Sequence, residues 1–247
     1  MTLQRVLRNF LPLVLLVSSQ VCLANTYENS CAVTLRISVL DDWPPYSWKN
    51  EAGEYQGIDV DFVTSVFSKL GFCWAYNTYP SSTRAFRELQ KGNVDVIFAA
   101  SYSEERAQWS TFSVPYRLED MRVVRHISDE SSNWSNSNST IVVNRGGYYG
   151  ELFEQFKEQC STCVYESNTA YERLNMVQNK RVRYALEDYA ATKYIKKQHN
   201  LEEIEISGET IHSSDIFLML RPDALTSEQL ELLNRQLEQH SKELHMH

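Results

Sequence analysis

Segments with the periodicity of a strand alternate with segments of helical periodicity along most of this chain. Residues 33–40 alternate between apolar and polar positions and are rich in β-branched side chains, which predicts a strand. From residue 58 onward, Val63, Val66 and Phe67 recur at helical spacing. Residues 94–100 form a short, continuous apolar run, typical of a parallel strand buried on both faces. With a strand at 73–79 and a helix at 84–92, this order predicts an α/β lobe.

A second series of the same kind follows in the second half of the chain. Residues 140–160 read as a strand, a glycine turn and a helix, and further strand and helix patterns continue to residue 198. A late strand is predicted at 216–221, followed by an amphipathic helix over 225–244. By contrast, residues 41–57 contain two prolines and two glycines and are predicted to be a loop. The sequence therefore predicts two α/β lobes.

The first 24 residues have the pattern of a secretory signal peptide. Arg5 and Arg8 form a basic start, the apolar run that follows is too short to span a bilayer, and cleavage is expected after Ala24. A membrane anchor would need a longer apolar run. A lipoprotein is disfavoured because Val21, rather than a small residue, precedes Cys22. We therefore expect an exported, periplasmic protein.

Charge and motif content exclude several classes of function. Loss of the two leader arginines changes the net charge from −8 to −10, and an acidic exported chain is a poor binder of nucleic acid or anionic membranes. The sequence lacks the GxSxG, GxxxxGK[ST], HExxH and GxGxxG patterns. Its histidines are scattered and fit surface positions. We therefore expect no cofactor and no metal, and a binding protein rather than an enzyme.

Four cysteines remain after removal of the leader: Cys31, Cys73, Cys160 and Cys163. An even count in an oxidising compartment favours two disulfides over free thiols. Cys160 and Cys163 form a CxxC pair, which also occurs as half of a zinc site or as a redox pair. No second CxxC and no HxxxH lie nearby, so a structural bridge is the favoured interpretation.

Polar and aromatic residues follow several of the predicted strands, at the position where open α/β sheets bind ligands. Arginine can hold a carboxylate through two parallel charge-assisted bonds, aspartate can hold an ammonium, and an indole can cover an aliphatic stem. Each residue also has a simpler explanation: the arginine can pair with a neighbouring glutamate, and the aspartate can cap a helix. Their shared position favours a site for a zwitterion. The candidates are Trp43, Ser101, Ser103, Arg106, Tyr148 and Asp188.

Three stretches resemble the periplasmic amino-acid-type solute-binding proteins, the receptors of polar-amino-acid ABC transporters. They are residues 44–72, 89–116 and 178–195, about a third of the mature chain. The resemblance is specific because G-x-D-x-D before a helix, G-x-V-D, S/T-x-x-R and F-S-x-P-Y occur together and in order.

The resemblance implies a type II periplasmic-binding-protein fold, in which two α/β lobes joined by a two-segment hinge close on the ligand. The first lobe would span residues 26–118 and the return segment 212–247, and the second lobe 122–208. The crossovers would be residues 117–121 and 208–212. In this arrangement the strands after Cys31 and Cys73 lie side by side and parallel. We therefore expect a bridge between these two cysteines, and a small loop closed by Cys160 and Cys163.

The resemblance also implies roles for individual residues. In this family the arginine of S/T-x-x-R binds the ligand carboxylate, which maps onto Arg106, with Ser103 three residues before it. The aromatic residue of the first loop maps onto Trp43, and the acid that holds the amino group maps onto Asp188. The chain departs from the family at residues 146–150, GGYYG, where many members have Gly followed by Ser or Thr. A tyrosine here narrows or repurposes the pocket.

These features lead to one leading hypothesis and two alternatives. The leading hypothesis is a monomeric periplasmic receptor that captures a small carboxylate-bearing solute, such as an amino acid, by hinge closure for an ABC permease. The second is an enzyme, because the fold resembles that of cyclohexadienyl dehydratase. That chemistry needs an acid or base in the cleft, for which Glu187, Asp188 or a tyrosine is available. The third is a sensor without a transport partner. A neighbouring permease gene, or product formed from prephenate or arogenate, would separate them.

Overall fold

A mixed β-sheet with helices packed on it organises the part of the chain that the computed structural model describes, residues 31–131, 133–136 and 139–245. The predicted signal peptide, residues 1–24, lies outside the described residues. No helix in this described part is long and apolar enough to cross a membrane. The strand order is β10 (Val164–Ser167), β9 (Ile141–Asn144), β11 (Tyr184–Asp188), β8 (Arg117–His126), β12 (Ile204–Leu220), β6 (Val96–Ser101), β1 (Val33–Ser38) and β5 (Phe72–Asn77), with β7 (Thr111–Phe112) paired to β12.

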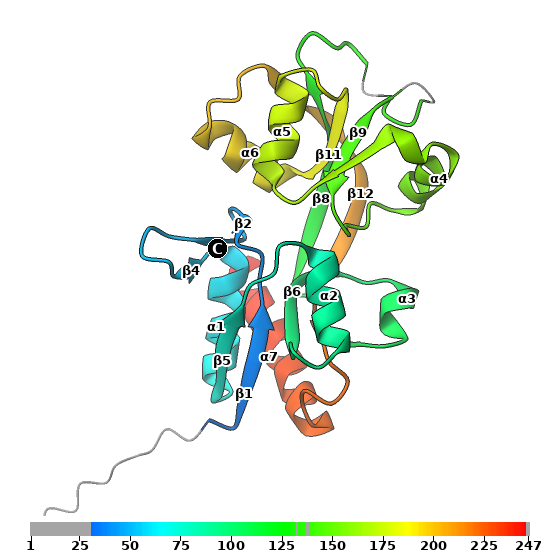
Figure 1. Cartoon of the computed structure of the whole chain (residues 1–247). Helices are drawn as coiled ribbons and strands as arrows, with labels where there is room; N and C mark the ends of the chain where they lie inside the picture. Colours follow the sequence, from blue (N-terminus) through cyan, green and yellow to red (C-terminus); the bar gives the residue numbers. More distant parts are fainter. Residues whose placement is uncertain (1–30, 132, 137–138, 246–247) are drawn as a thin grey trace, which may run out of the picture. The chain divides into compact units, whose positions relative to one another are not determined.

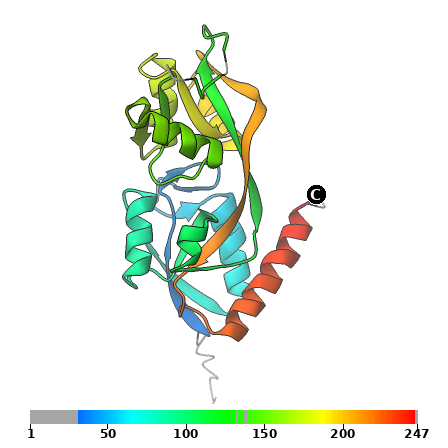
Figure 2. The same cartoon turned by 90° about the vertical axis from the view of Figure 1, so that its right-hand side faces the viewer.

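The first lobe contains the strand and helix order predicted from the sequence. Strand β1 pairs in parallel with β5 and with β6. Helix α1 (Ile58–Lys69) buries the apolar face that includes Val63, Val66 and Phe67, and α7 (Ser227–His245) packs beside it (Figure 2). Helix α2 (Ser82–Gln90) is capped at its start by a serine side chain.

The second lobe repeats the pattern with its own apolar cores. Strand β9 pairs in parallel with β10 and β11. Helix α4 (Glu151–Gln159) packs Phe153 and Phe156 against one core. Helices α5 (Ala170–Gln178) and α6 (Tyr189–Gln198) contribute to a second core. All three helices lie within residues 140–198, where strand and helix patterns were predicted.

Strands β8 and β12 link the two lobes as one long antiparallel pair (Figure 1). The predicted crossovers, residues 117–121 and 208–212, are therefore parts of these strands and not separate connections. The strand predicted at 216–221 is the last part of β12. Because β12 runs antiparallel to β6, the sheet is mixed, and β6 is parallel only to β1. The fold is two α/β lobes joined by a two-segment hinge, as predicted.

The segment 41–57 is more ordered than the loop predicted from its prolines and glycines. It forms a small antiparallel sheet of β2 (Asp42–Trp43), β3 (Ser47–Lys49) and β4 (Tyr55–Gln56). Glycine is required at position 57, where φ is +126° and a Cβ would lie 2.4 Å from the backbone oxygen of Tyr46. The pairing depends on residues several positions apart, which explains why local composition did not predict it.

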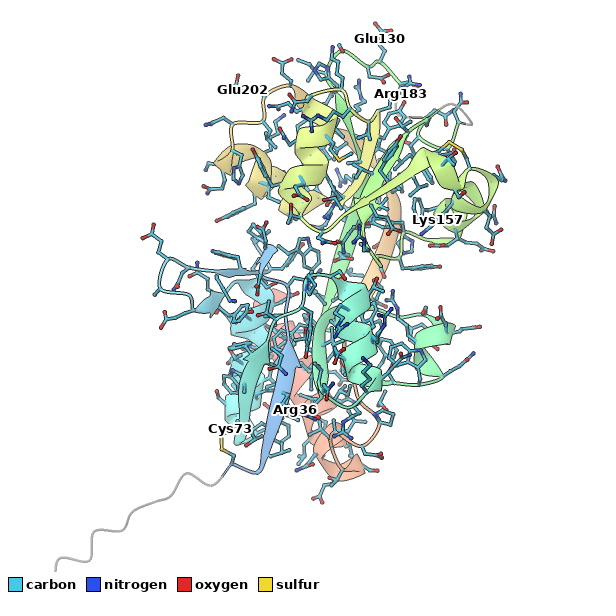
Figure 3. All side chains as sticks on the ribbon, viewed as in Figure 1. Arg36, Cys73, Glu130, Lys157, Arg183 and Glu202 are labelled. Atoms are coloured by element: carbon cyan, nitrogen blue, oxygen red, sulfur yellow. A yellow bond between two sulfur atoms is a disulfide. The ribbon has the colours of Figure 1, made fainter. Side chains whose placement is uncertain are left out.

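Both expected disulfides are present. Cys31 pairs with Cys73 across a Cα–Cα distance of 5.5 Å, and Cys160 pairs with Cys163 across 5.3 Å. Figure 3 shows the first bridge at the Cys73 label, at the start of β5. The parallel register of β1 and β5 places both cysteines at the same edge of the sheet, which is the reason for the predicted pairing.

Candidate ligand-binding site

A cavity of about 380 Å³ lies beyond the carboxyl ends of β1, β6, β9 and β11. This is the position at which open α/β sheets bind ligands. Five of the six candidates from the sequence line it; Ser103 does not. The five are Trp43, Ser101, Arg106, Tyr148 and Asp188.

Arg106 is a half-buried cation without an acidic partner in the described part of the chain. Its guanidinium donates to the backbone oxygens of Ser101 (2.9 Å) and Gly146 (3.0 Å). The group also lies 4.5 Å from the centre of the Phe86 ring. Burial lowers the pKa of Arg106, and the charges of Glu105 and Glu154 only partly oppose this. A pairing of Arg106 with a neighbouring glutamate, the simpler explanation, is not observed among the described ion pairs.

The two serines before Arg106 position it in different ways. Ser101 is buried at the end of β6, and its backbone oxygen accepts the hydrogen bond from the arginine side chain. Ser103 caps the short helix α3 (Glu104–Ala107), where its Oγ accepts from the Arg106 backbone N–H at 3.3 Å. The structure therefore gives Ser103 a supporting place behind Arg106, outside the cavity lining.

Asp188 is both a helix cap and part of the cavity wall. Its side chain is buried, and Oδ1 accepts from the Ala191 backbone N–H and from the Tyr46 hydroxyl, each at 2.9 Å. The other oxygen, Oδ2, accepts from the Asp120 backbone N–H at 3.3 Å. The capping role considered from the sequence is confirmed, and the same carboxylate faces the cavity.

In the glycine-rich turn after β9, the backbone of Gly146 approaches helix α2 of the first lobe closely. Gly146 has φ +78°, and a Cβ there would lie 2.6 Å from Thr83 Oγ1. Tyr148 lines the cavity and contacts the His212 ring edge-on, with ring centroids 5.5 Å apart. Tyr149 is buried, and its hydroxyl oxygen accepts from the Asn144 N–H at 2.7 Å. Two tyrosines thus occupy the wall formed by this turn.

Sequence reasoning missed Glu119, a buried carboxylate on β8 that lines the cavity. Burial raises its pKa to about 7, against the attraction of Arg117, and the charges of Asp188 and Asp59 add to the rise. Its neighbour Arg117 is bound by both oxygens of Asp59, at 2.7 and 3.0 Å. The sequence carried no local signal for this role, because residues 117–121 resemble a connection between lobes. In the structure Glu119 lies on the same face of β8 as buried Met121, two residues away.

A buried ion pair forms another part of the cavity wall. Arg173 donates to both oxygens of Glu187, and both residues are 2% exposed. Arg173 also donates to Asn144 Oδ1 and to the Ser167 backbone oxygen, so all three nitrogens of its guanidinium form hydrogen bonds. We find no group of three metal-ligand side chains among the described residues.

Comparison with known proteins identifies the family of the chain. A model of the bacterial extracellular solute-binding proteins, family 3, matches residues 35–243. The chain belongs to this family. The match covers both lobes and the β8–β12 pair, so the solute-binding fold accounts for nearly all of the described residues.

Members and neighbours of this solute-binding family have diverse recorded roles. A cyclohexadienyl dehydratase of Pseudomonas aeruginosa is 26% identical over 121 residues, which span 46% of this chain and 44% of that enzyme. The match thus covers less than half of the enzyme. An ancestral arginine-binding protein bound to arginine is 25% identical, covers 85% of this chain and 92% of its own, and superposes with a TM-score of 0.73.

Another solved structure supports the fold alone. A histidine kinase sensor domain with similarity to periplasmic binding proteins is 18% identical, with a TM-score of 0.75 and coverage of 86% of this chain and 92% of its own. This solute-binding fold therefore occurs in proteins with different functions. The function of this chain has to be inferred from the residues of its cavity and not from the fold.

Proposed function

We propose that this solute-binding protein captures a small solute that carries a carboxylate, an amino acid above all, in the 380 Å³ cavity. The observation that carries the proposal is Arg106. A half-buried guanidinium at a cavity wall, held in place by two backbone oxygens and by the Phe86 ring, has no acidic partner in the described chain. A ligand carboxylate supplies that partner through two parallel charge-assisted bonds.

The presence of both a positive and a negative side chain in the cavity wall supports a zwitterionic ligand. Asp188 and Glu119 line the same cavity as Arg106, so it offers both an anion-binding and a cation-binding group. The cavity volume falls within the range of about 300–1,000 Å³ that is typical of small-molecule sites. The ancestral arginine-binding protein described above was solved with arginine, which supports an amino acid as the ligand. A second structure of an ancestral arginine-binding protein, also 25% identical to this chain, holds glutamine.

Hinge closure is the proposed mechanism. Groups from both lobes meet at the cavity: the Tyr46 hydroxyl donates to Asp188, and Arg106 donates to the Gly146 backbone oxygen. A solute that touches both lobes favours their closed arrangement by its higher affinity for that state. Delivery to an ABC permease is supported by the family and by a neighbour named as a putative L-cystine ABC transporter of Listeria monocytogenes.

The experiment is a thermal-shift screen of the mature protein against the common amino acids and small carboxylates. A ligand present at about 100 times its Kd stabilises the native state by about 2.7 kcal/mol, which raises the Tm by about 5 °C or more. A shift produced by amino acids supports the proposal. If only solutes without a carboxylate shift the Tm, the proposal is wrong.

One observation favours a second candidate, an enzyme of the dehydratase type. Glu119 is a buried carboxyl with a pKa of about 7, in the same cavity as a carboxylate-binding arginine. A group with this pKa can serve as a general acid near neutral pH. Product released from prephenate or arogenate by the wild type, and lost in Glu119→Gln, would support this activity.

A further inference from the structure

Glu119 is the least satisfied of the buried carboxylates that line the cavity. The residue is 7% exposed, and its Oε1 lies 3.5 Å from Arg117 Nη2, which is long for a charge-assisted hydrogen bond. No other hydrogen bond to its carboxylate occurs among the described contacts. A buried charge with so little compensation is unfavourable unless a proton or a cation neutralises it.

The neighbouring groups are already engaged with one another. Arg117 donates from Nε and Nη2 to the two carboxylate oxygens of Asp59, at 2.7 and 3.0 Å. Its guanidinium carbon lies 3.9 Å from the centre of the Tyr46 ring. Asp188 accepts from Tyr46 and from two backbone N–H groups. Asp59 and Glu119 thus share one guanidinium, and Glu119 is the one of the two that lines the cavity.

We propose that Glu119 binds the cationic group of the solute, beside Asp188, and so selects protonated amines over ligands that carry only a carboxylate. This inference rests on the proposed function, because it names the ligand chemistry of the same cavity. A protonated amine provides three N–H donors and one positive charge. It therefore supplies both of the interactions that the Glu119 carboxylate lacks.

The proposal has a consequence for protons. Burial raises the pKa of Glu119 to about 7, so a fraction of the unliganded molecules carry its proton at neutral pH. The charged and titratable groups around it are Asp59 on α1, Arg117 on its own strand, Asp188 at the end of β11, and the hydroxyls of Tyr46 and Tyr149. Binding of a cation expels the proton, and affinity for amines rises from pH 6 to pH 8.

The test is calorimetric titration at pH 7 in two buffers of different ionisation enthalpy, which measures protons released on binding. The probes are each of the common L-amino acids and, for comparison, the monocarboxylates from acetate to hexanoate. For the amino acid that binds the wild type, we expect release of a measurable fraction of a proton per site. In Glu119→Gln we expect that release to disappear and the affinity to fall at least tenfold, while any monocarboxylate binding stays unchanged.

Asp120→Asn is the matched control. Asp120 is the next residue on β8, and its carboxylate bonds to Arg122 and Thr210 outside the cavity lining. It should keep both the affinity and the proton release of the wild type. Glu119→Asp, which retains the charge, should recover part of the proton release if Glu119→Gln is poorly folded.

Three results would overturn the proposal. The first is a folded Glu119→Gln variant that binds the amino acid and releases protons as the wild type does. Glu119 would then not contact the ligand, although the proposed function would stand. Monocarboxylates that bind the wild type as tightly as amino acids show that the site does not select cations. If no amino acid binds the wild type, the proposed amino-acid ligand and this inference are both wrong.

Discussion

Replacement of Glu119 by glutamine should change how the stability of the unliganded protein depends on pH. The folded protein holds the pKa of this carboxyl at about 7, compared with 4.5 for an unperturbed glutamate. The native state thus binds the proton more tightly than the unfolded state does. Moving a pKa from 4.5 to about 7 corresponds to about 3 kcal/mol. Because the side chain is buried, solvent screening does not reduce this value appreciably.

The sign follows from the raised pKa. The stabilising contribution of the protonated group is fully present below pH 4.5 and is lost as the pH rises through about 7. Glutamine is neutral throughout and has no such loss. Between pH 5 and pH 8, the unfolding free energy of the wild type should therefore fall by about 2–3 kcal/mol relative to that of Glu119→Gln.

Urea denaturation of both proteins at pH 5 and pH 8, without ligand, measures this difference. Asp120→Asn provides a control that should change in parallel with the wild type over this range, because the hydrogen bond from Arg122 lowers the pKa of Asp120 and its contribution is lost only below pH 5. If the wild type and Glu119→Gln change in parallel from pH 5 to pH 8, Glu119 is not a buried titrating group, and the reasoning about the cavity is refuted.

Three further changes test the scaffold around the cavity, each by urea denaturation. Replacing Cys31 and Cys73 by serine should cost about 4 kcal/mol on the chain-entropy model for a separation of 42 residues, and an effect below 1 kcal/mol would contradict that model. Arg173→Met should cost about 3–5 kcal/mol because it leaves Glu187 buried without its cation, and a neutral result would show that the pair is not buried in solution. Tyr46→Phe should cost about 1.5–3 kcal/mol through the lost bond to a buried carboxylate, whereas an unchanged protein would mean that the hydroxyl does not bridge the lobes.

Local sequence signals predicted the elements of this fold well. The helical spacing of Val63, Val66 and Phe67 and the apolar run before Ser101 each depend on one segment, and the structure contains the expected helix and strand. The position of Arg106 after a strand likewise predicted that it lines the cavity, because the carboxyl ends of strands in α/β sheets converge on one edge.

Features that depend on pairing between distant segments could not be predicted. Residues 117–121 look like a polar connection, and only the partner β12 makes them a strand that buries Glu119. The ion pair of Arg173 with Glu187 joins a helix to a strand, and neither residue differs locally from a surface charge. The small sheet within 41–57 could not be predicted for the same reason, because its prolines and glycines are also typical of a loop.

Calorimetric titration of Arg106 variants with an amino acid identified by the thermal-shift screen tests the central claim most directly. Arg106→Lys keeps the charge but cannot form two parallel bonds, and it should weaken binding strongly. Arg106→Ala should lose about 3–5 kcal/mol of binding free energy, while Arg84→Ala, an exposed arginine of α2 paired with Glu88, should bind as the wild type does. Unchanged affinity in a folded Arg106→Ala would contradict the account and place the ligand elsewhere.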